Sequence, residues 1–291
     1  MLRHASRIAL LLACTACAEQ ALAHGAEQHN VGATINAWVL ICLLAAAGWY
    51  ALGVARLRPR THRGASVSGR RIASFSFGLV LLGLALASPL DTLGADLFSA
   101  HMLQHEAMML GAAPLLVAGR PLPVFLWALP PSARMRTGIV LRSRAVHHAW
   151  RTLSRPIGAW WLHAVVLWAW HVPRLFQAGL ANEAVHVLQH ASFLAAALLF
   201  WSSVARAGAG MAVLSLLATA IHTGILGALL TFSPHVWYPV YDGRTDAWGL
   251  TLLEDQQLGG LIMWVPAGFL LVFAGVAAAA RALGQDRERA A

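Results

Sequence analysis

The hydrophobic residues of this chain fall in long runs that few charged residues interrupt. A helix needs about 20 predominantly apolar residues to cross a membrane. We expect such helices at residues 34–54, 72–88, 97–118, 157–172, 184–204, 211–232 and 258–280. Another apolar segment, residues 121–130, is too short to cross, so we expect it to be interfacial or re-entrant. The pattern predicts an all-α fold, a polytopic membrane bundle of about seven transmembrane helices.

Composition agrees with a membrane protein. Of the 291 residues, 58% are hydrophobic and 11% are charged, whereas a soluble domain carries about 25% charged residues. A formal net charge of +9 is also found in proteins that bind nucleic acid. The basic residues are instead scattered through short connections, with no basic tract interleaved with aromatic residues. We therefore expect a lipid bilayer, and no nucleic acid, around this chain.

Residues 1–23 are typical of a secretory signal peptide. Arg3 and Arg7 form its positive end, an apolar stretch follows, and Ala21 and Ala23 form an A-x-A cleavage motif. We expect a transmembrane domain at residues 24–281 and a short, unstructured cytoplasmic tail at residues 282–291. If the first segment is not cleaved, it would remain as an anchor.

The arginines predict the orientation of the bundle. All 21 basic residues are arginine. Seventeen follow the first, third, fifth and seventh expected helices, whereas only Arg174 and Arg244 lie in connections on the opposite side. Because positively charged connections remain in the cytoplasm, we expect the mature N-terminus outside, in the periplasm, and the C-terminus in the cytoplasm.

Histidines cluster at the outer ends of three expected helices. His101 and His105 are four residues apart, so they share one helix face about 6 Å apart along the axis. His186 and His190 form a second such pair, and His171 ends another helix on the same side. Polar groups at membrane depth are costly, and imidazole is the commonest metal ligand. The convergence of these side chains therefore predicts a metal site.

Copper is the metal that these residues favour. The outer compartment is oxidising, which makes thiolate ligands a poor choice there. Met102 and Met109 lie beside the first histidine pair. Thioether sulfur selects Cu(I), and imidazole also suits copper. We therefore expect the histidines, with Met102 and Met109, to hold a copper ion.

Five other polar residues are possible ligands or hydrogen-bonding partners of the ligands. They are Glu106, His222, His235, Asp242 and Asp255. Glu106 could equally be a neutral, protonated side chain, and the sequence leaves these roles open.

Four segments resemble one known family in their order along the chain. They are HMLQHEAMMLGAAPLLVAGRPLP (101–123), HVPRLFQAGL (171–180), HVLQHASFLAAALLFW (186–201) and LLEDQQLGGLIMWVPAGFL (252–270). These segments resemble the CtaG family of cytochrome c oxidase assembly factors, the multi-spanning kind found with caa-type oxidases. The N-terminal third matches that family only in hydropathy.

The resemblance implies a bacterial inner (plasma) membrane protein that is needed to mature a haem–copper oxidase and acts in copper insertion. We expect a bundle with no catalytic turnover. The implied partners are cytochrome c oxidase subunits and, for metal transfer, a periplasmic copper chaperone. The family's histidine motifs correspond here to His101, His105, His171, His186 and His190.

Three alternatives remain open at this point. Paired histidines could be axial ligands in a haem-binding membrane cytochrome. A copper transporter would need polar groups continuing through the membrane, for which His163 and His222 are the only indications. The histidines could also pack within a structural scaffold. No nucleophile or paired-carboxylate motif indicates an enzyme.

Overall fold

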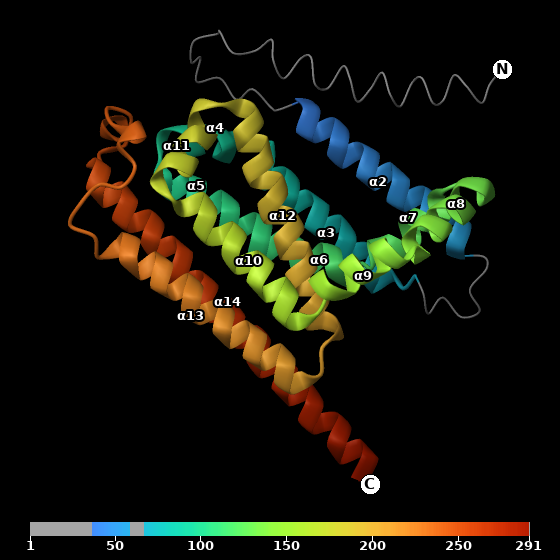
Figure 1. Cartoon of the computed structure of the whole chain (residues 1–291). Helices are drawn as coiled ribbons and strands as arrows, with labels where there is room; N and C mark the ends of the chain where they lie inside the picture. The colour runs from blue at the N-terminus through green and yellow to red at the C-terminus, as the bar shows by residue number, and fades with distance from the viewer. Residues whose placement is uncertain (1–36, 59–66, 291) are drawn as a thin grey trace, which may run out of the picture.

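A computed structural model describes residues 37–58 and 67–290, and every regular element among them is helical (Figure 1). The elements are α2 Ala37–Leu57, α3 Gly69–Leu86, α4 Pro89–Asp96, α5 Phe98–Glu106, the π-helix η3 Ala107–Ala112, α6 Ala113–Ala118, α7 Pro121–Ala128, α8 Pro131–Arg142, α9 Arg144–Leu153, α10 Pro156–His171, α11 Pro173–Ala181, α12 Glu183–Arg206, α13 Ala209–Thr231, the 3₁₀ helices η4 Pro239–Tyr241 and η5 Thr245–Trp248, and α14 Leu252–Ala290. The signal-peptide prediction, residues 1–23, lies outside the described residues.

Five of the described helices are long and apolar enough to cross a membrane: α2, α3, α12, α13 and α14. A sixth span is possible where residues 98–118 continue, after a 61° bend, into α7. That bend agrees with the expectation of an interfacial or re-entrant segment at residues 121–130. Helix α10 has 16 residues, about 24 Å, which is less than the roughly 30 Å hydrocarbon core of a bilayer. The total of seven therefore stays a prediction.

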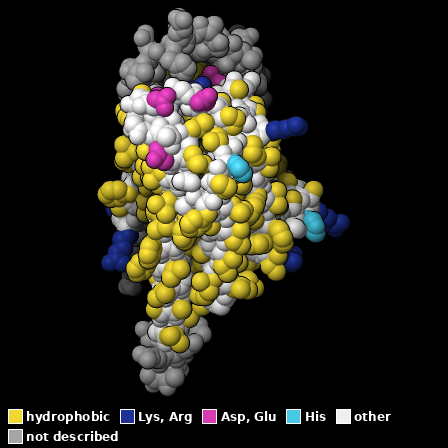
Figure 2. Space-filling model, turned by 90° about the vertical axis from the view of Figure 1, so that its left-hand side faces the viewer, with side chains coloured by type: hydrophobic (Ala, Val, Ile, Leu, Met, Phe, Trp, Pro, Cys, Tyr) yellow, Lys and Arg dark blue, Asp and Glu magenta, His cyan; other side chains and the backbone are white. Residues whose placement is uncertain are grey.

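The outer surface is largely apolar. Large side chains such as Leu44, Phe77 and Phe273 are 70%, 68% and 72% exposed. Figure 2 shows hydrophobic side chains covering most of one face, while the acidic side chains on that face gather toward one end. Lipid solvates apolar side chains as well as a protein core does, so this surface fits a multi-pass membrane protein.

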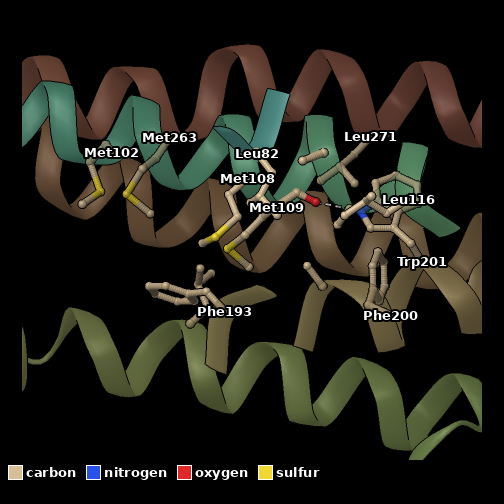
Figure 3. Close-up of a cluster of buried hydrophobic side chains, with 14 of the residues drawn as sticks. Leu82, Met102, Met108, Met109, Leu116, Phe193, Phe200, Trp201, Met263 and Leu271 are labelled. Carbon is tan, nitrogen blue, oxygen red and sulfur yellow. Dashed lines mark hydrogen bonds between the residues drawn. The ribbon is translucent and has the colours of Figure 1, made fainter. Parts of the chain in front are cut away.

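Helix α5 lies inside the bundle. Helices α13 and α14 run side by side (Figure 1), and α14 also packs against α5. Helix α12 packs against α10, η3 and α6. The apolar core between them includes Met108, Phe193, Phe200 and Leu271, each at most 1% exposed (Figure 3). Helix α5 thus packs directly against α14, while its histidine side chains face α12.

The third expected helix contains a π-helical turn that its hydrophobic pattern does not predict. Pro114 has no N–H to donate to the carbonyl of Leu110, four residues earlier, so the regular ladder is interrupted there. In η3 the Ala113 N–H bonds instead to the Met108 carbonyl, five residues earlier. The Met109 carbonyl accepts a 2.9 Å hydrogen bond from the Trp201 Nε1–H of α12. π-Helical turns often accompany functional sites, and this one directly follows His105.

Helix α14 is longer at both ends than expected. At its start, Thr251 and Glu254 form a capping box, with the Thr251 N–H donating to the Glu254 carboxylate at 2.8 Å. At its end the helix continues to Ala290, so the expectation of an unstructured tail at residues 282–291 is wrong. Most residues in this stretch, such as Ala, Arg, Leu, Gln and Glu, favour helix strongly enough to extend it.

Candidate metal centre

Helix α5 presents the first histidine pair to the interior. His101 and His105 are 1% and 4% exposed, and their ring centroids lie 4.3 Å apart. This is the adjacency that a spacing of four residues predicts on a helix.

Helix α12 presents the second pair. Asn182 caps its start, because the Asn182 side chain accepts a 3.1 Å hydrogen bond from the Val185 N–H. His186 and His190 follow one and two turns later, with ring centroids 4.2 Å apart. Both rings are half-buried, so the α12 side of the cluster is the more accessible side.

The two pairs face each other across the α5–α12 interface. The His101 ring centroid lies 5.5 Å from that of His186 and 5.9 Å from that of His190. His105 and His190 are 5.1 Å apart. One ligand nitrogen from each of His101, His186 and His190 lies within 4.8 Å of the other two. Tetrahedral bonds of about 2 Å hold ligand atoms roughly 3.3 Å apart, so small ring rotations suffice to close around an ion.

Most ring nitrogens of this cluster are buried without a hydrogen bond that meets normal geometry among the described residues. Both nitrogens of His101 and of His105 are buried without a hydrogen bond, as is Nε2 of His186 and of His190. A buried polar group without a partner costs about 1–3 kcal/mol. Several such groups facing one point are compatible with a cation as their shared partner, and neutral imidazole is the form that binds metals.

His171 joins the cluster from the end of α10. Its Nδ1 lies 2.7 Å from the Leu167 carbonyl, which favours the tautomer with the proton on Nδ1 and a lone pair on Nε2. Nε2 is buried and has no hydrogen bond. The ring is close enough to His101 and His105 to interact with them electrostatically. His171 thus adds a fifth imidazole with an unpartnered nitrogen, although it is not one of the three residues whose ligand atoms lie closest together.

Asp255 positions α5 from the neighbouring helix α14. The carboxylate is fully buried and accepts hydrogen bonds from the Phe98 N–H at 2.6 Å and the Ser99 N–H at 3.1 Å. The Ser99 hydroxyl also donates to it. Both carboxylate oxygens thus cap the N-terminus of α5. Asp255 stabilises the helix that carries His101 and His105, which fits a supporting role better than that of a ligand.

Gln104 and Asp91 are supporting residues that the sequence patterns did not single out. Gln104 is fully buried on α5, and its Nε2 donates to the Ala85 carbonyl at 2.9 Å and to the Asp91 carboxylate at 2.6 Å. Burial raises the pKa of the Asp91 carboxyl, although the hydrogen bond from Gln104 acts in the opposite direction. Asp91 also interacts electrostatically with His186. A Gln one residue before His105, with an Asp 13 residues earlier, is too weak a signal to find from sequence.

The connection between α13 and α14 forms hydrogen bonds with two helices near the cluster. The Tyr238 hydroxyl donates to the His171 carbonyl at 2.8 Å, and the Tyr241 hydroxyl donates to the Gly94 carbonyl at 3.0 Å. Burial raises the pKa of both tyrosines, so these hydroxyls remain protonated donors. The connection is thereby tied both to the end of α10 and to α4.

The two methionines occupy different surroundings. Met102 lies beside Met263 of α14 (Figure 3), and a Cβ built on Gly259 would lie 3.3 Å from its Cγ. Met109 lies with Met108 over Phe193 (Figure 3), whose ring centroid is 4.6 Å from that of His105. Met102 thus packs against α14, whereas Met109 lies near the phenyl ring that borders His105.

The remaining predicted residues do not join the cluster of three histidines. Glu106 has one buried carboxylate oxygen without a hydrogen bond. His222 lies on α13 beside His163 of α10, with ring centroids 5.8 Å apart. His235 and Asp242 are exposed in the connection between α13 and α14. These two are therefore not supported as ligands by the structure.

With this geometry in view, the comparison with known families is informative. The family model for the cytochrome c oxidase caa3 assembly factor matches residues 48–285. The chain belongs to this family. The match includes all five histidines of the outer cluster and confirms the resemblance recognised in the sequence.

Two curated relatives of this assembly factor family member are similar over most of its length. They are described as uncharacterized proteins, Mb0105 of Mycobacterium bovis and MT0111 of Mycobacterium tuberculosis. Each is 27% identical over 281 residues, covering 90% of this chain and 42% of the relative. The chain therefore spans less than half the length of these relatives. No solved structure matches it.

Proposed function

We propose that the protein binds copper through His101, His186 and His190 and assists its insertion into a haem–copper oxidase. His105 and His171 complete the set of available imidazoles. The observation that carries this proposal is the group of three ligand nitrogens from α5 and α12 within 4.8 Å of one another. Membership of the oxidase assembly family supplies the oxidase as the recipient.

The donor set supports copper over a structural zinc ion. Imidazole suits both metals, but a closed zinc site has four fixed ligands. His186 and His190 are only half-buried, which suits a site from which an ion is passed to another protein. By the distribution of arginines this end of the bundle faces the periplasm, where an oxidase subunit or a copper chaperone would exchange the metal.

A haem is less compatible with this arrangement. Axial histidines must leave a flat slot between them for the macrocycle. Here the ring centroids of His101 and His105 are 4.3 Å apart, and the His101 ring also faces the rings of His186 and His190. The other imidazoles thus occupy the space beside each facing pair.

The test couples metal analysis to oxidase assembly in a deletion strain. The strain would be complemented with wild type, with His101→Ala/His190→Ala, or with His147→Ala/His148→Ala, which removes two imidazoles from the exposed helix α9. We expect wild type and the α9 variant to retain copper on purification and to restore oxidase activity and oxidase copper. The α5–α12 variant should lose both, while still reaching the membrane at the wild-type level. Equal copper content in all three proteins would contradict the proposal.

A further inference from the structure

A second pair of histidines lies deeper in the bundle. His163 on α10 and His222 on α13 have ring centroids 5.8 Å apart, with an interplanar angle of 66°. His163 is eight residues before His171, so it lies about 12 Å further along the α10 axis than the outer cluster. His222 is near the middle of α13. The two imidazoles come from different helices and meet at this depth, with His163 buried and His222 half-buried.

Three ring nitrogens of this pair are buried without a hydrogen bond among the described residues, although the His222 side chain as a whole is half-buried. His163 is 3% exposed, and its Nδ1 has no hydrogen bond. Both nitrogens of His222 are also buried and have no hydrogen bond among the described residues. Packing alone does not explain the choice of histidine here, because an apolar side chain of similar size would avoid the cost of about 1–3 kcal/mol for each orphaned group.

The neighbours of the pair are aromatic. The Phe200 ring centroid is 5.1 Å from that of His163, and the Trp160 ring centroid is 5.5 Å from that of His222. In the described part of the chain, no acidic side chain interacts electrostatically with either histidine. A site of two neutral nitrogens and aromatic walls suits a singly charged soft cation, since desolvating a divalent ion without anionic ligands would cost far more. Aromatic faces also attract cations.

We propose that His163 and His222 form a second metal site, which binds one Cu(I) ion between two imidazole nitrogens. A metal held linearly at about 2 Å from each of two ring nitrogens places the ring centroids roughly 6 Å apart, close to the 5.8 Å observed. Soft, low-coordinate Cu(I) tolerates this small ligand set, whereas zinc prefers four ligands. The site is carried by different residues from those of the proposed function and does not depend on them.

Phe193 and Phe200 place the two histidine groups along one face of α12. The ring centroid of Phe193 lies 4.6 Å from that of His105 in the outer cluster. The ring centroid of Phe200 lies 5.1 Å from that of His163. Seven residues, about two turns, separate the phenylalanines. The protein would thus hold copper at two depths, with apolar residues between them.

The test is anaerobic titration of the full-length protein, purified in detergent, with Cu(I) against a chromogenic chelator. We expect two tightly bound ions in wild type. One should remain in His163→Phe/His222→Leu, where apolar residues replace the imidazoles. One should also remain in His101→Ala/His190→Ala, and its X-ray absorption spectrum should show two nitrogen ligands in a linear arrangement. His147→Ala/His148→Ala is the matched control and should bind two.

The outcomes separate this site from the outer one. If His101→Ala/His190→Ala stays folded by circular dichroism but binds no Cu(I), the inner site is overturned, while the outer site stands. If it still binds every ion that wild type binds, the outer site fails. If His163→Phe/His222→Leu binds as many ions as wild type, the inner proposal is again overturned.

Discussion

The outer histidine cluster and the inner histidine pair are made of the same side chain but are built into the fold differently. The outer cluster joins α5 and α12, and polar residues that hydrogen-bond to neighbouring elements support it. Asp255 caps α5 with both oxygens, and Gln104 ties α5 to α4. The inner pair, His163 and His222, contacts Phe200 and Trp160 instead.

This difference indicates how each group is held in place. The outer rings depend on helix positions that other polar residues fix, so changes several residues away should disturb their geometry. The inner rings depend on close apolar packing between α10 and α13. Substitutions that affect one group and spare the other therefore test whether the two are separate sites.

Asp255→Ala should produce the largest difference between the Cu(I) affinities of the outer and inner sites. Loss of the carboxylate leaves the Phe98 and Ser99 N–H groups buried without an acceptor, at about 1–3 kcal/mol each. We expect a lower thermal unfolding temperature and a loss of outer-site Cu(I) affinity of about 100-fold, as for loss of groups that orient metal ligands. Cu(I) competition titration would measure this, with the inner site unchanged. Asp246→Ala, an exposed acid of η5, should have no effect, and wild-type affinity in Asp255→Ala would refute the positioning role.

His171→Phe should have the next largest effect. The substitution keeps a buried ring of similar shape but removes the Nε2 lone pair. If His171 completes the copper coordination, outer-site affinity should fall between 10-fold and 100-fold, the range for loss of a contributing group at a metal site. The same titration would detect it, and an unchanged affinity would show that His171 only packs beside the cluster.

Gln104→Leu should weaken the outer site more modestly. The change removes hydrogen bonds to the Ala85 carbonyl and to Asp91 while keeping a similar volume. We expect stability to fall by about 1–3 kcal/mol and outer affinity to fall roughly tenfold. Thermal unfolding with and without Cu(I) would measure both changes. A fall in stability with no change in Cu(I) affinity would show that Gln104 stabilises the fold but does not position the outer site.

Gly94→Ala should have the smallest effect. A Cβ at this position would lie 3.3 Å from the His101 Cα and 3.4 Å from its Nδ1, which is close enough to shift the ring slightly. We expect outer affinity to fall by about two- to fivefold, equivalent to less than 1 kcal/mol. Gly138→Ala is the matched control, because a Cβ there meets nothing within 4 Å. Equal affinity in both variants would show that the ring has room to move.

The sequence predicts the helices and the paired histidines well because both depend on local periodicity. A spacing of four residues brings His101 beside His105 in any α-helix. The contact between this pair and His186 depends on how α5 packs against α12, which no local pattern determines. Asp255 was noticed only as a polar residue, because its role requires α14 to lie against the start of α5.

Other features were not predicted from the sequence, and each has a physical reason. Two features accompany the π-turn η3: Pro114, and the hydrogen bond from Trp201 to the Met109 carbonyl. The proline can be read from the sequence, whereas the hydrogen bond depends on how α12 packs against η3. The start of α14 had a readable signal in the T-x-x-E capping box at Thr251, which hydropathy alone overlooked. The sequence shows His163 and His222 only as polar residues deeper in the membrane, and their contact appears only when α10 and α13 are placed together.

The most direct test of the account is copper K-edge X-ray absorption in the His163→Phe/His222→Leu background, loaded with one equivalent of Cu(I). In that background the outer cluster should supply the ligands. We predict a spectrum with about three imidazole nitrogens at roughly 2 Å, which disappears when His101→Ala/His190→Ala is added. A shell dominated by sulfur, or the same imidazole spectrum after those substitutions, would contradict an outer copper site shared by α5 and α12.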